Sequence, residues 1–498
     1  MLSRIQALFA RGDSASRGKT LFHNTAALSV GRLGSKVLVF LLIRFYTGVL
    51  TDAQYGTADL ITNLANLLIP LACAGLSSGF FRFVAEAQDR NDRRRVFNSG
   101  LVLLAIAGLI FVCLSPLLAL WKYFSPYVFL VVLYVLVANA HYFCTEYIRG
   151  LGNYRLFAIQ GLLNTALNIG WNLIFLLPFD MGVTGYVLSI ILADLMTTAF
   201  VFWRARLWEV LALRRADKQL MRDMLRFCLP LIPATICWWV TNVSDRYMVT
   251  YFCGEAANGL YTAAYKIPNL LTICGSIFIE AWQFSAVVEN RKRRERESEL
   301  ESIQRRRSVT GFFTRIFRGY APLLFIGGGA MIMCSQLFAK ILFDPSFFAG
   351  WVYIPVLMAA TVFSALASFV GSVYLVEKRA NMSLLTAAIG AVLNVMLNLL
   401  LIPAMGAMGA AIATLVAYAA LLGIRMINAR RYIPFACQPT RLCTSCVLLI
   451  LLALFISPIW RSFGAAAVVF FLLVLNNIGP LYRCVCQWLN IRQKRENS

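Results

Sequence analysis

Charged and amide side chains recur inside the most apolar segments of this sequence, at spacings that place them on single helix faces. In the first of these segments, Thr25, Ser29, Arg32 and Lys36 are spaced four, three and four residues apart, which makes one stripe along a helix. A charge in hydrocarbon costs about 3 kcal/mol on insertion scales, so such residues usually face a bundle interior or a wet cavity. The chemistry that we expect from this stripe is the lining of a polar cavity inside a membrane.

Three further groups of polar residues have the same character and the same predicted role. They are Asp59, Asn63 and Asn66; Asn242, Asp245 and Arg246; and Thr262, Lys266 and Asn269. Glu280 lies three helical turns beyond Asn269, on the same side of its helix. We expect all of these side chains to line the cavity.

Some of these residues also have a purely structural explanation. Arg32 lies near the end of its segment, so its long side chain could reach the lipid headgroups, whereas Lys36 lies one turn deeper. Asp245 and Arg246 could neutralise each other as a structural pair.

Other polar residues inside the apolar segments fit packing positions at least as well. His141, Glu146 and Asp194 are as compatible with packing or with the membrane interface as with a cavity. The asparagine pairs at 168/172 and 394/398 favour hydrogen bonds between helices over ligand binding.

No pattern in the sequence indicates an enzyme, a cofactor or a metal. There is no phosphate-cradling Gly-Lys loop, no His-Glu-x-x-His pair and no nucleophile elbow, and no soluble segment is long enough for an ATP site. The pairs Cys443/Cys446 and Cys484/Cys486 each stand alone in a chain with two histidines. We interpret the 13 cysteines as small apolar residues, mostly inside membrane segments.

The composition excludes a soluble globular protein. Of the 498 residues, 60% are hydrophobic, and the mean hydropathy is +0.71. Runs of about 20 mostly apolar residues are long enough to span a bilayer as helices, and fourteen such runs predict an all-α integral membrane protein. The spans lie near residues 22–48, 58–81, 97–119, 125–148, 156–177, 181–203, 227–252, 257–285, 319–339, 350–373, 382–402, 406–427, 442–460 and 463–482.

Basic residues alternate between successive loops, and this alternation predicts the orientation. The loop at 82–95 holds five arginines and the segment at 291–318 holds ten basic residues, whereas the loop after the first span holds none. Because basic loops stay in the cytoplasm, both termini are predicted to be cytoplasmic. The net charge of +23 then suits the anionic cytoplasmic leaflet, and no nucleic-acid partner is expected. The N-terminus lacks the pattern of a cleaved signal peptide, so the first span is expected to remain.

Two pairs of matching segments indicate an internal repeat. Residues 167–185 and 393–409 both read Leu-Asn, a second Asn four residues later, an apolar run, a Pro and two Gly three apart. Residues 51–66 match 254–269 and align the polar triplets of the two copies. Spans 1–6 therefore correspond to spans 7–12, and the even number makes the repeat parallel. We interpret the duplicated Pro and Gly residues as a turn between helices.

These boundaries divide the chain into five parts. They are a cytoplasmic arm at 1–21, an N-lobe at 22–203, a basic cytoplasmic linker at 204–226, a C-lobe at 227–427, and spans 13 and 14 with a cytoplasmic tail at 428–498. The C-lobe contains a charged cytoplasmic loop at 286–318, which we interpret as a solvated and partly helical insertion. The repeat axis is expected to make the polar faces of the two lobes oppose each other.

The segment SVGRLGSKVLVFLLIRFYTGVLTDAQYG at 29–56 resembles the opening of bacterial polysaccharide transporters of the multidrug/oligosaccharidyl-lipid/polysaccharide exporter superfamily. In that family, a first helix with embedded basic residues leads to a short outside turn that ends in Tyr-Gly or a similar pair. The repeated Asn, Pro and Gly-x-x-Gly pattern and the two trailing helices are similar too. The resemblance covers spans 1–12.

This resemblance implies a lipid-linked oligosaccharide flippase whose two six-helix lobes form a V around a central cavity. Such a protein moves an undecaprenyl-pyrophosphate-linked repeat unit across the bacterial inner membrane for O-antigen, capsule or exopolysaccharide synthesis, by alternating access. Its partners would be the lipid-linked oligosaccharide, membrane lipids, a polysaccharide polymerase and a chain-length regulator.

The resemblance also implies roles for the polar residues. Arg32 and Lys36 would hold the pyrophosphate, with Lys266 and Arg246 facing them from the other lobe. The amides that could hydrogen-bond sugar hydroxyls are Asn63, Asn66, Asn242 and Asn269. The acids that could couple transport to a proton or a sodium ion are Asp59, Asp245 and Glu280.

Four other functions compete with this interpretation. A cation-coupled multidrug exporter of the same superfamily favours a cavity rich in acids and aromatic residues, whereas these stripes hold more bases than acids. A carrier of the major facilitator type would show a Gly- and Asp-Arg-rich signature, which the loop RFVAEAQDRNDRRR at 82–95 lacks. A membrane glycosyltransferase or polymerase normally carries a large outside loop. A non-transporting component of a polysaccharide-assembly complex would suit an uncharged cavity better.

Overall fold

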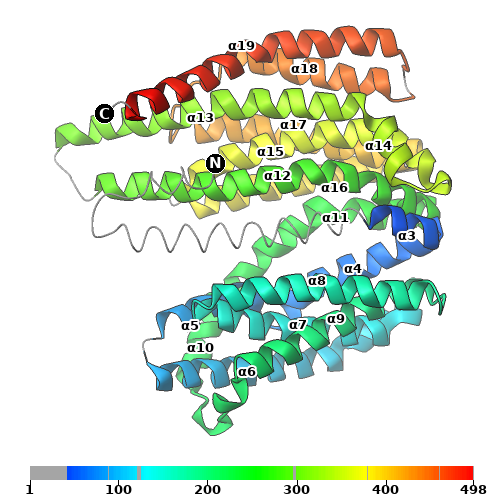
Figure 1. The fold of residues 1–498 in the computed structure, drawn as a ribbon, viewed down its shortest axis with the longest axis vertical. Coiled ribbons are helices and arrows are strands. Elements are labelled where there is room, and N and C mark those ends of the chain that lie inside the picture. The colour runs from blue at the N-terminus through cyan, green and yellow to red at the C-terminus, as the bar shows by residue number, and fades with distance from the viewer. Residues whose placement is uncertain are drawn as a thin grey trace. The chain divides into compact units, whose positions relative to one another are not determined.

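The computed structural model describes residues 42–87, 89–120, 125–294, 299–377, 379–458 and 460–496. Within these ranges the chain is almost entirely helical and contains no β-strand (Figure 1), so the predicted all-α class is confirmed there. The chain divides into two compact units, Met1–Trp239 and Val240–Ser498, which are referred to below as unit 1 and unit 2.

Unit 1 is built from helices joined by short turns. Its α-helices are α3 (Ile43–Val49), α4 (Asp52–Ala72), α5 (Leu76–Glu86), α6 (Arg90–Leu114), α7 (Val128–Gly150), α8 (Tyr154–Leu176), α9 (Gly182–Arg204) and α10 (Lys218–Cys228). Short 3-10 helices lie at Ser115–Leu120, Ser125–Tyr127, Leu207–Glu209, Leu213–Arg215 and Leu229–Leu231. Helix α7 packs against α4, α5 and α9, and α8 packs against α9. Helix α11 (Ile232–Cys253) begins in unit 1 and ends in unit 2.

Unit 2 is organised around helix α15. Its helices are α12 (Glu255–Arg294), α13 (Glu299–Met333), α14 (Ser335–Leu342), the 3-10 segment η7 (Pro345–Tyr353), α15 (Ile354–Val376), α16 (Ala380–Met405), α17 (Ala407–Ala429), α18 (Pro439–Ile456) and α19 (Phe463–Glu496). Helices α12, α13 and α17 pack against α15. The span that contains α15 is 78% buried inside the protein, whereas the span of α6 is only 11% buried. Helix α15 is therefore a core helix, and α6 turns its apolar side chains outward, as a lipid-facing helix does.

Nine helical segments in the described ranges are long and apolar enough to cross a membrane, which makes the chain a multi-pass membrane protein. They are Arg90–Leu120, Ser125–Gly150, Gly182–Arg204, Phe313–Met333, Pro345–Tyr374, Asn381–Met405, Ala407–Ala429, Pro439–Ile456 and Phe463–Arg483. Each coincides with one of the fourteen predicted spans. Predicted spans 2, 5, 7 and 8 correspond to α4, α8, α11 and α12, whose polar side chains lower the mean hydropathy. Most of predicted span 1 lies outside the described residues.

The second predicted span, at 58–81, is broken into two helices. Helix α4 already begins at Asp52, because the Thr51 hydroxyl accepts from the backbone N of Gln54 and the Gln54 side chain accepts from the backbone N of Thr51. It ends at Ala72, and Gly75 before α5 has a φ of 77°. A Cβ at Gly75 would lie 2.5 Å from the carbonyl oxygen of Cys228. The sequence pattern misses this break because the segment is apolar on both sides of the glycine.

The duplicated glycines form equivalent turns in the two units. Gly182 begins α9 with a φ of 51°, and Gly406 precedes α17 with a φ of 61°. A Cβ on Gly409 would lie 2.3 Å from the carbonyl oxygen of Leu401, so α16 and α17 can approach each other here only without a side chain. The repeat therefore marks the turn between two packed helices, in agreement with the sequence-based interpretation.

The charged segment at 286–318 is more helical than a solvated loop. Helix α12 continues to Arg294 and α13 begins at Glu299, while residues 295–298 lie outside the described ranges. The physical reason is composition, because Glu, Lys, Arg and Gln are all good helix formers. The two spans thus extend beyond the apolar segments from which they were predicted.

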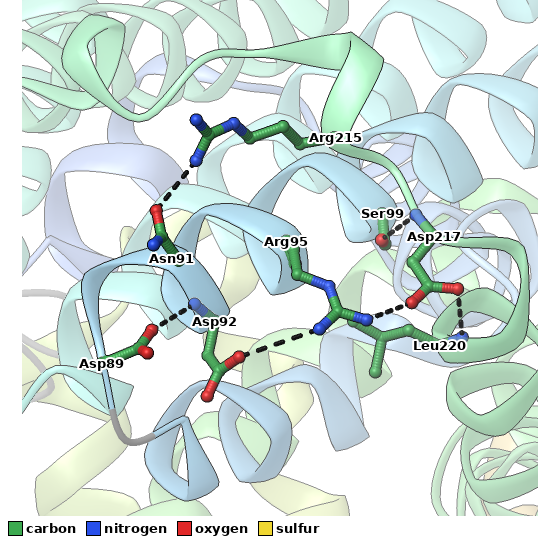
Figure 2. A network of polar contacts seen from close by, with 8 residues as sticks. All are labelled: Asp89, Asn91, Asp92, Arg95, Ser99, Arg215, Asp217 and Leu220. Carbon is green, nitrogen blue, oxygen red and sulfur yellow. Dashed lines mark hydrogen bonds and ion pairs between the residues drawn. The ribbon is translucent and has the colours of Figure 1, made fainter.

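The basic linker after α9 is fastened to the first turns of α6, as Figure 2 shows. Arg95 of α6 forms an ion pair with Asp217, and the backbone N–H of Asp217 donates to the Ser99 hydroxyl at 2.9 Å. Arg215 donates to Asn91 Oδ1 at 2.9 Å. The hydrogen bond from Arg95 lowers the pKa of Asp217 below its usual value. The linker is therefore a structured part of unit 1.

Asn98 of α6 forms hydrogen bonds with the backbone of the linker. Its side chain is fully buried, donates to the carbonyl oxygen of Val210 at 2.9 Å and accepts from the backbone N of Ala212 at 2.8 Å. Arg94 adds a bond to the carbonyl oxygen of Glu209 at 2.8 Å. A buried amide that satisfies one donor and one acceptor of the linker fixes its path across α6.

Candidate functional site

The predicted acid Asp245 is the centre of a buried polar cluster in unit 2. It lies on α11 with 2% of its surface exposed. Its Oδ2 accepts from the Tyr261 hydroxyl of α12 at 2.7 Å and from the Thr414 hydroxyl of α17 at 3.5 Å. Its Oδ1 accepts from the backbone N of Arg246 at 2.9 Å. Three helices therefore supply hydrogen bonds to this carboxylate, which is what a charged group needs in an apolar interior.

The cluster continues along α16 through two asparagines. Asn394 donates from Nδ2 to the Thr414 hydroxyl at 3.3 Å, and Asn398 donates to Asn394 Oδ1 at 3.0 Å. Both asparagines are buried, and Asn398 Oδ1 has no hydrogen-bond partner within the described part of the chain. The pair was predicted to bond between helices. Within the pair the bond lies in one helix, because residues four apart share a face, and Asn394 alone makes the contact to α17.

Two basic residues of unit 2, one on α11 and one on α12, follow directly after residues already described or aromatic. Arg246 is 7% exposed, and its guanidinium carbon lies 5.1 Å from the centre of the Tyr265 ring on α12, within the range of a cation–π contact. Lys266 follows Tyr265 on α12 and is half-buried. Asn242 accepts from the Tyr418 hydroxyl of α17 at 2.8 Å. Unit 2 therefore brings an acid, a guanidinium and an amide together on α11 and surrounds them with tyrosines.

Unit 1 holds a smaller cluster on α4. Asp59 is 7% exposed, and its Oδ2 accepts from Asn63 Nδ2 at 2.9 Å, one turn further along the helix. The same amide group donates to the carbonyl oxygen of Asp59 at 2.8 Å. The backbone oxygen of Asn63 accepts from the Trp239 indole at 2.8 Å. Asn66 was predicted on the same stripe, but its side chain is exposed.

The remaining predicted residues are only partly described. Arg32 and Lys36 lie outside the described residues. Glu280 lies in α12, but its side chain is outside the description, whereas Asn269 of the same helix is half-buried. In the described ranges, no group of three or more His, Cys, Asp or Glu residues could hold a metal ion.

The sequence-based search missed the hydroxyl groups of this site. Tyr261, Thr414 and Tyr418 contact the predicted residues, but no tyrosine and no residue of α17 was among the predicted site residues. Thr414 and Tyr418 are four residues apart in the mostly apolar helix α17. This spacing was the available signal, because it places two hydroxyl groups on one helix face.

The geometry defines a class of protein: a helical, multi-pass membrane protein with buried charges on its helices. Residues 21–282, just over half of the chain, match the family model described as polysaccharide biosynthesis protein. The chain therefore belongs to the polysaccharide biosynthesis protein family. The comparison with curated proteins found no match.

Solved structures with the same fold include MATE transporters and a lipid II flippase. An inward-facing multidrug resistance MATE family transporter of the MOP superfamily is 17% identical with a TM-score of 0.64, and the alignment covers 82% of this chain and 98% of that one. The lipid II flippase MurJ in an inward closed conformation is 12% identical with a TM-score of 0.61, covering 92% of this chain and 99% of that one. An outward-facing MATE transporter has a TM-score of 0.53 at 16% identity, covering 84% and 96%. These likenesses identify the fold, and together with the family match they agree with the predicted resemblance.

Proposed function

We propose that this protein is a flippase for a lipid-linked oligosaccharide repeat unit, of the undecaprenyl-pyrophosphate type, in the bacterial inner membrane. The headgroup of such a lipid carries a pyrophosphate and several sugars, and neither crosses hydrocarbon unaided. The translocated unit would serve O-antigen, capsule or exopolysaccharide synthesis, in association with a polysaccharide polymerase and a chain-length regulator.

The observation that carries the proposal is the buried Arg246 beside Tyr265, followed on the same helix by Lys266. Cations inside membrane helices are costly and call for an anionic ligand or a wet path. In a chain of the polysaccharide biosynthesis family, the anion that fits this requirement is the pyrophosphate of a lipid-linked sugar. Guanidinium groups suit phosphate oxygens because they donate two parallel hydrogen bonds.

The proposed division of labour follows the chemistry of each residue type. Arg32 and Lys36 in the first span would hold the pyrophosphate together with Arg246 and Lys266. The sugar hydroxyls would be bound by Asn63, Asn66, Asn242 and Asn269. The ion that drives transport would bind at an acid, with Asp59, Asp245 and Glu280 as candidates.

Asp245 is the candidate with the strongest structural support among these acids. Tyr261 and Thr414 approach one of its oxygens, and the Asn398 oxygen nearby in the same network lacks a partner within the described residues. Oxygen atoms that converge around a carboxylate suit a proton or a hard cation such as sodium. Binding and release of the ion would accompany alternating access in a protein of fourteen membrane helices, arranged as two six-helix lobes and two C-terminal helices.

Deletion of the gene tests the proposed function directly. Lipid-linked repeat units should accumulate in the cytoplasmic leaflet, while the purified protein in proteoliposomes should move a fluorescent lipid-linked oligosaccharide between leaflets. Normal surface polysaccharide in the deletion strain, without accumulation, would contradict the proposal. Efflux of cationic drugs without lipid translocation would favour the multidrug exporter, whose fold is the same.

Lys36 offers a test of the substrate site inside the cell. The variant Lys36→Ala should abolish export of the polysaccharide while the amount of protein in the membrane stays unchanged, because the pyrophosphate loses a fixed cation. Export is measured as surface polysaccharide and protein amount by immunoblot. Export at the wild-type rate would assign Lys36 to the lipid headgroups instead.

A further inference from the structure

Four polar side chains from three helices of unit 1 meet inside the bundle, and none of them belongs to the proposed substrate site. His141 of α7 places Nδ1 3.0 Å from Asp194 Oδ1 of α9, and its Nε2 lies 3.0 Å from Gln160 Oε1 of α8. Asn164 of α8 donates from Nδ2 to the same Asp194 oxygen at 2.8 Å. These four residues are named the His141 cluster.

The His141 cluster lies in a setting that penalises a net charge. Gln160 and Asp194 are 6% and 9% exposed, and the side chains of His141 and Asp194 are 14% and 12% exposed. Both residues lie near the middle of helices that are long and apolar enough to span a membrane. An ionised Asp194 therefore needs a positive partner within contact distance, and the group in contact that can carry this charge is the His141 imidazole.

The directions of the hydrogen bonds indicate which form of His141 the cluster fits. A neutral imidazole has one donor and one acceptor nitrogen, whereas the imidazolium donates from both. Both nitrogens of His141 face oxygen atoms, one from a carboxylate and one from an amide. With Oε1 of Gln160 toward Nε2, this arrangement satisfies the imidazolium completely, whereas a neutral imidazole would need the Gln160 amide turned so that its NH2 group donates to Nε2.

No other titratable group described near His141 supplies a positive charge to Asp194 in its place. Tyr134 and Tyr142 of α7 lie close to Asp194 and are neutral phenols at physiological pH. Helix α8 faces the pair with the amides of Gln160 and Asn164. The other charged groups on the packed helices lie mostly at helix ends. They are Arg155 at the start of α8, Arg204 at the end of α9, Asp52 at the start of α4 and the charges in the first turns of α6. Glu146 pairs with Arg149 on α7, Arg82 and Glu86 form an exposed pair on α5, and Asp59 of α4 lies near Tyr186 of α9.

We propose that the His141 cluster is a proton-binding site within the membrane, separate from the Asp245 cluster. Its ligand is a proton that moves onto His141 Nε2 or Nδ1 and converts the pair with Asp194 into a neutral ion pair. Loss of the proton leaves an uncompensated carboxylate among α7, α8 and α9, so release requires these helices to separate or water to enter. Where the chain transports a lipid-linked sugar, which rests on the proposed function, this release links transport to pH.

The sequence makes a direct measurement possible because the chain contains only two histidines. In the variant His23→Gln, reconstituted in lipid nanodiscs with ¹⁵N-labelled histidine, every imidazole signal comes from His141. We expect both nitrogens to be protonated at about pH 7.5, where an isolated histidine is mostly neutral. A neutral imidazole at this pH would overturn the proposal.

Two substitutions of the same size should move the titration of His141 in opposite directions. In Asp194→Asn the proton should be lost about 1–3 pH units lower, and in Gln160→Glu it should be held to a higher pH. The exposed Asp180→Asn, which is the same chemical change outside the cluster, serves as the control and should leave the midpoint unchanged. Midpoints equal to the control in both variants would overturn the pairing, and opposite shifts cannot result from misfolding.

A transport assay separates this proposal from the proposed function. Proteoliposomes that contain wild type or His141→Asn are given a pH gradient, and movement of a fluorescent lipid-linked oligosaccharide is followed. We expect the gradient to alter the wild-type rate several-fold and to have no effect on the variant. An equal response in both proteins would overturn the link to transport. If the wild type moves no lipid at all, the proposed function fails, and the spectroscopic titration still decides the proton site.

Discussion

At the scale of single residues, Asp245 and Arg246 of unit 2 have different contacts, and these contacts suit different ligands. Asp245 accepts hydrogen bonds from α12 and α17, so its carboxylate is held in place before any ligand arrives. Arg246 lies over Tyr265, where the face of the ring supports the cation. One side chain is thus prepared for a cation and its neighbour for an anion.

Removal of the Arg246 charge should slow translocation of the lipid-linked substrate. A hydrogen bond to a charged group contributes about 1.5–3 kcal/mol, so Arg246→Gln should reduce the rate at low substrate about 10- to 150-fold. The measurement is lipid translocation in proteoliposomes. Arg430→Gln, which removes an exposed arginine after α17, is the matched control and should be without effect. Equal rates for the two variants would contradict the assigned role.

Asp245 can be tested by its response to ions. In Asp245→Asn the side chain keeps its shape but loses the charge that would bind a proton or sodium, so an ion gradient should no longer accelerate translocation. The same assay with imposed sodium or proton gradients provides the measurement. Asp180→Asn makes the same change at an exposed turn residue with a φ of 45°, which Asn tolerates. A gradient response in Asp245→Asn as strong as in this control would exclude Asp245 as the coupling acid.

At the scale of elements, the linker between α9 and α10 shows how a basic segment becomes structured. Its charges are held at the first turns of α6 by Arg95, Asn98 and Ser99, and Asp217 also caps α10 by accepting from the backbone N of Gln219 at 2.8 Å. Sequence reasoning placed this segment on the cytoplasmic side from its arginines. The contacts with α6 could not be predicted, because they depend on which helix ends lie next to each other.

The lowered pKa of Asp217 predicts how the stability of this contact depends on pH. A group whose pKa is lowered on folding stabilises the folded state above its unfolded pKa, about 3.9 for Asp. That stabilisation is lost as the pH falls through the lower folded pKa. The thermal unfolding midpoint should therefore fall less between about pH 6 and 3 in Asp217→Asn than in wild type, because the Asn retains the helix cap without the ion pair. Asp223→Asn, an exposed change on the same helix, should behave as wild type, and an identical profile for all three proteins would contradict the role of the Arg95 contact.

At the scale of the whole molecule, the duplicated sequence segments adopt similar turns in the two units, but their helices differ in detail. The turn at Gly182 recurs at Gly406, yet α4 breaks before Gly75 whereas α12 runs from Glu255 to Arg294 without interruption. A single residue such as Gly75 can thus give matching sequence segments different helix lengths.

The parallel repeat predicts a membrane orientation that reporter fusions can measure. A fluorescent protein that folds in the cytoplasm should be active after the C-terminus and in the linker near residue 211. A phosphatase that is active outside the cytoplasm should report from the turns near residues 180 and 406. These results follow from the placement of basic loops. Phosphatase activity at the linker, or opposite orientations for the two turns, would contradict the parallel arrangement.

The sequence by itself determined the all-helical membrane class and the positions of most helices in the described ranges, and it singled out Asp59, Asp245 and Arg246, which the structure shows to be buried. Apolar runs, loop charges and the repeated Pro and Gly residues each depend on residues that are close together along the chain, so they can be recognised in a single sequence. Only the tertiary structure decided which of these residues meet. Tyr261 and Thr414 contact Asp245, and His141 contacts Asp194, across helices that are separated along the chain. Such contacts depend on how helices pack and rotate, and many different rotations satisfy the same apolar pattern.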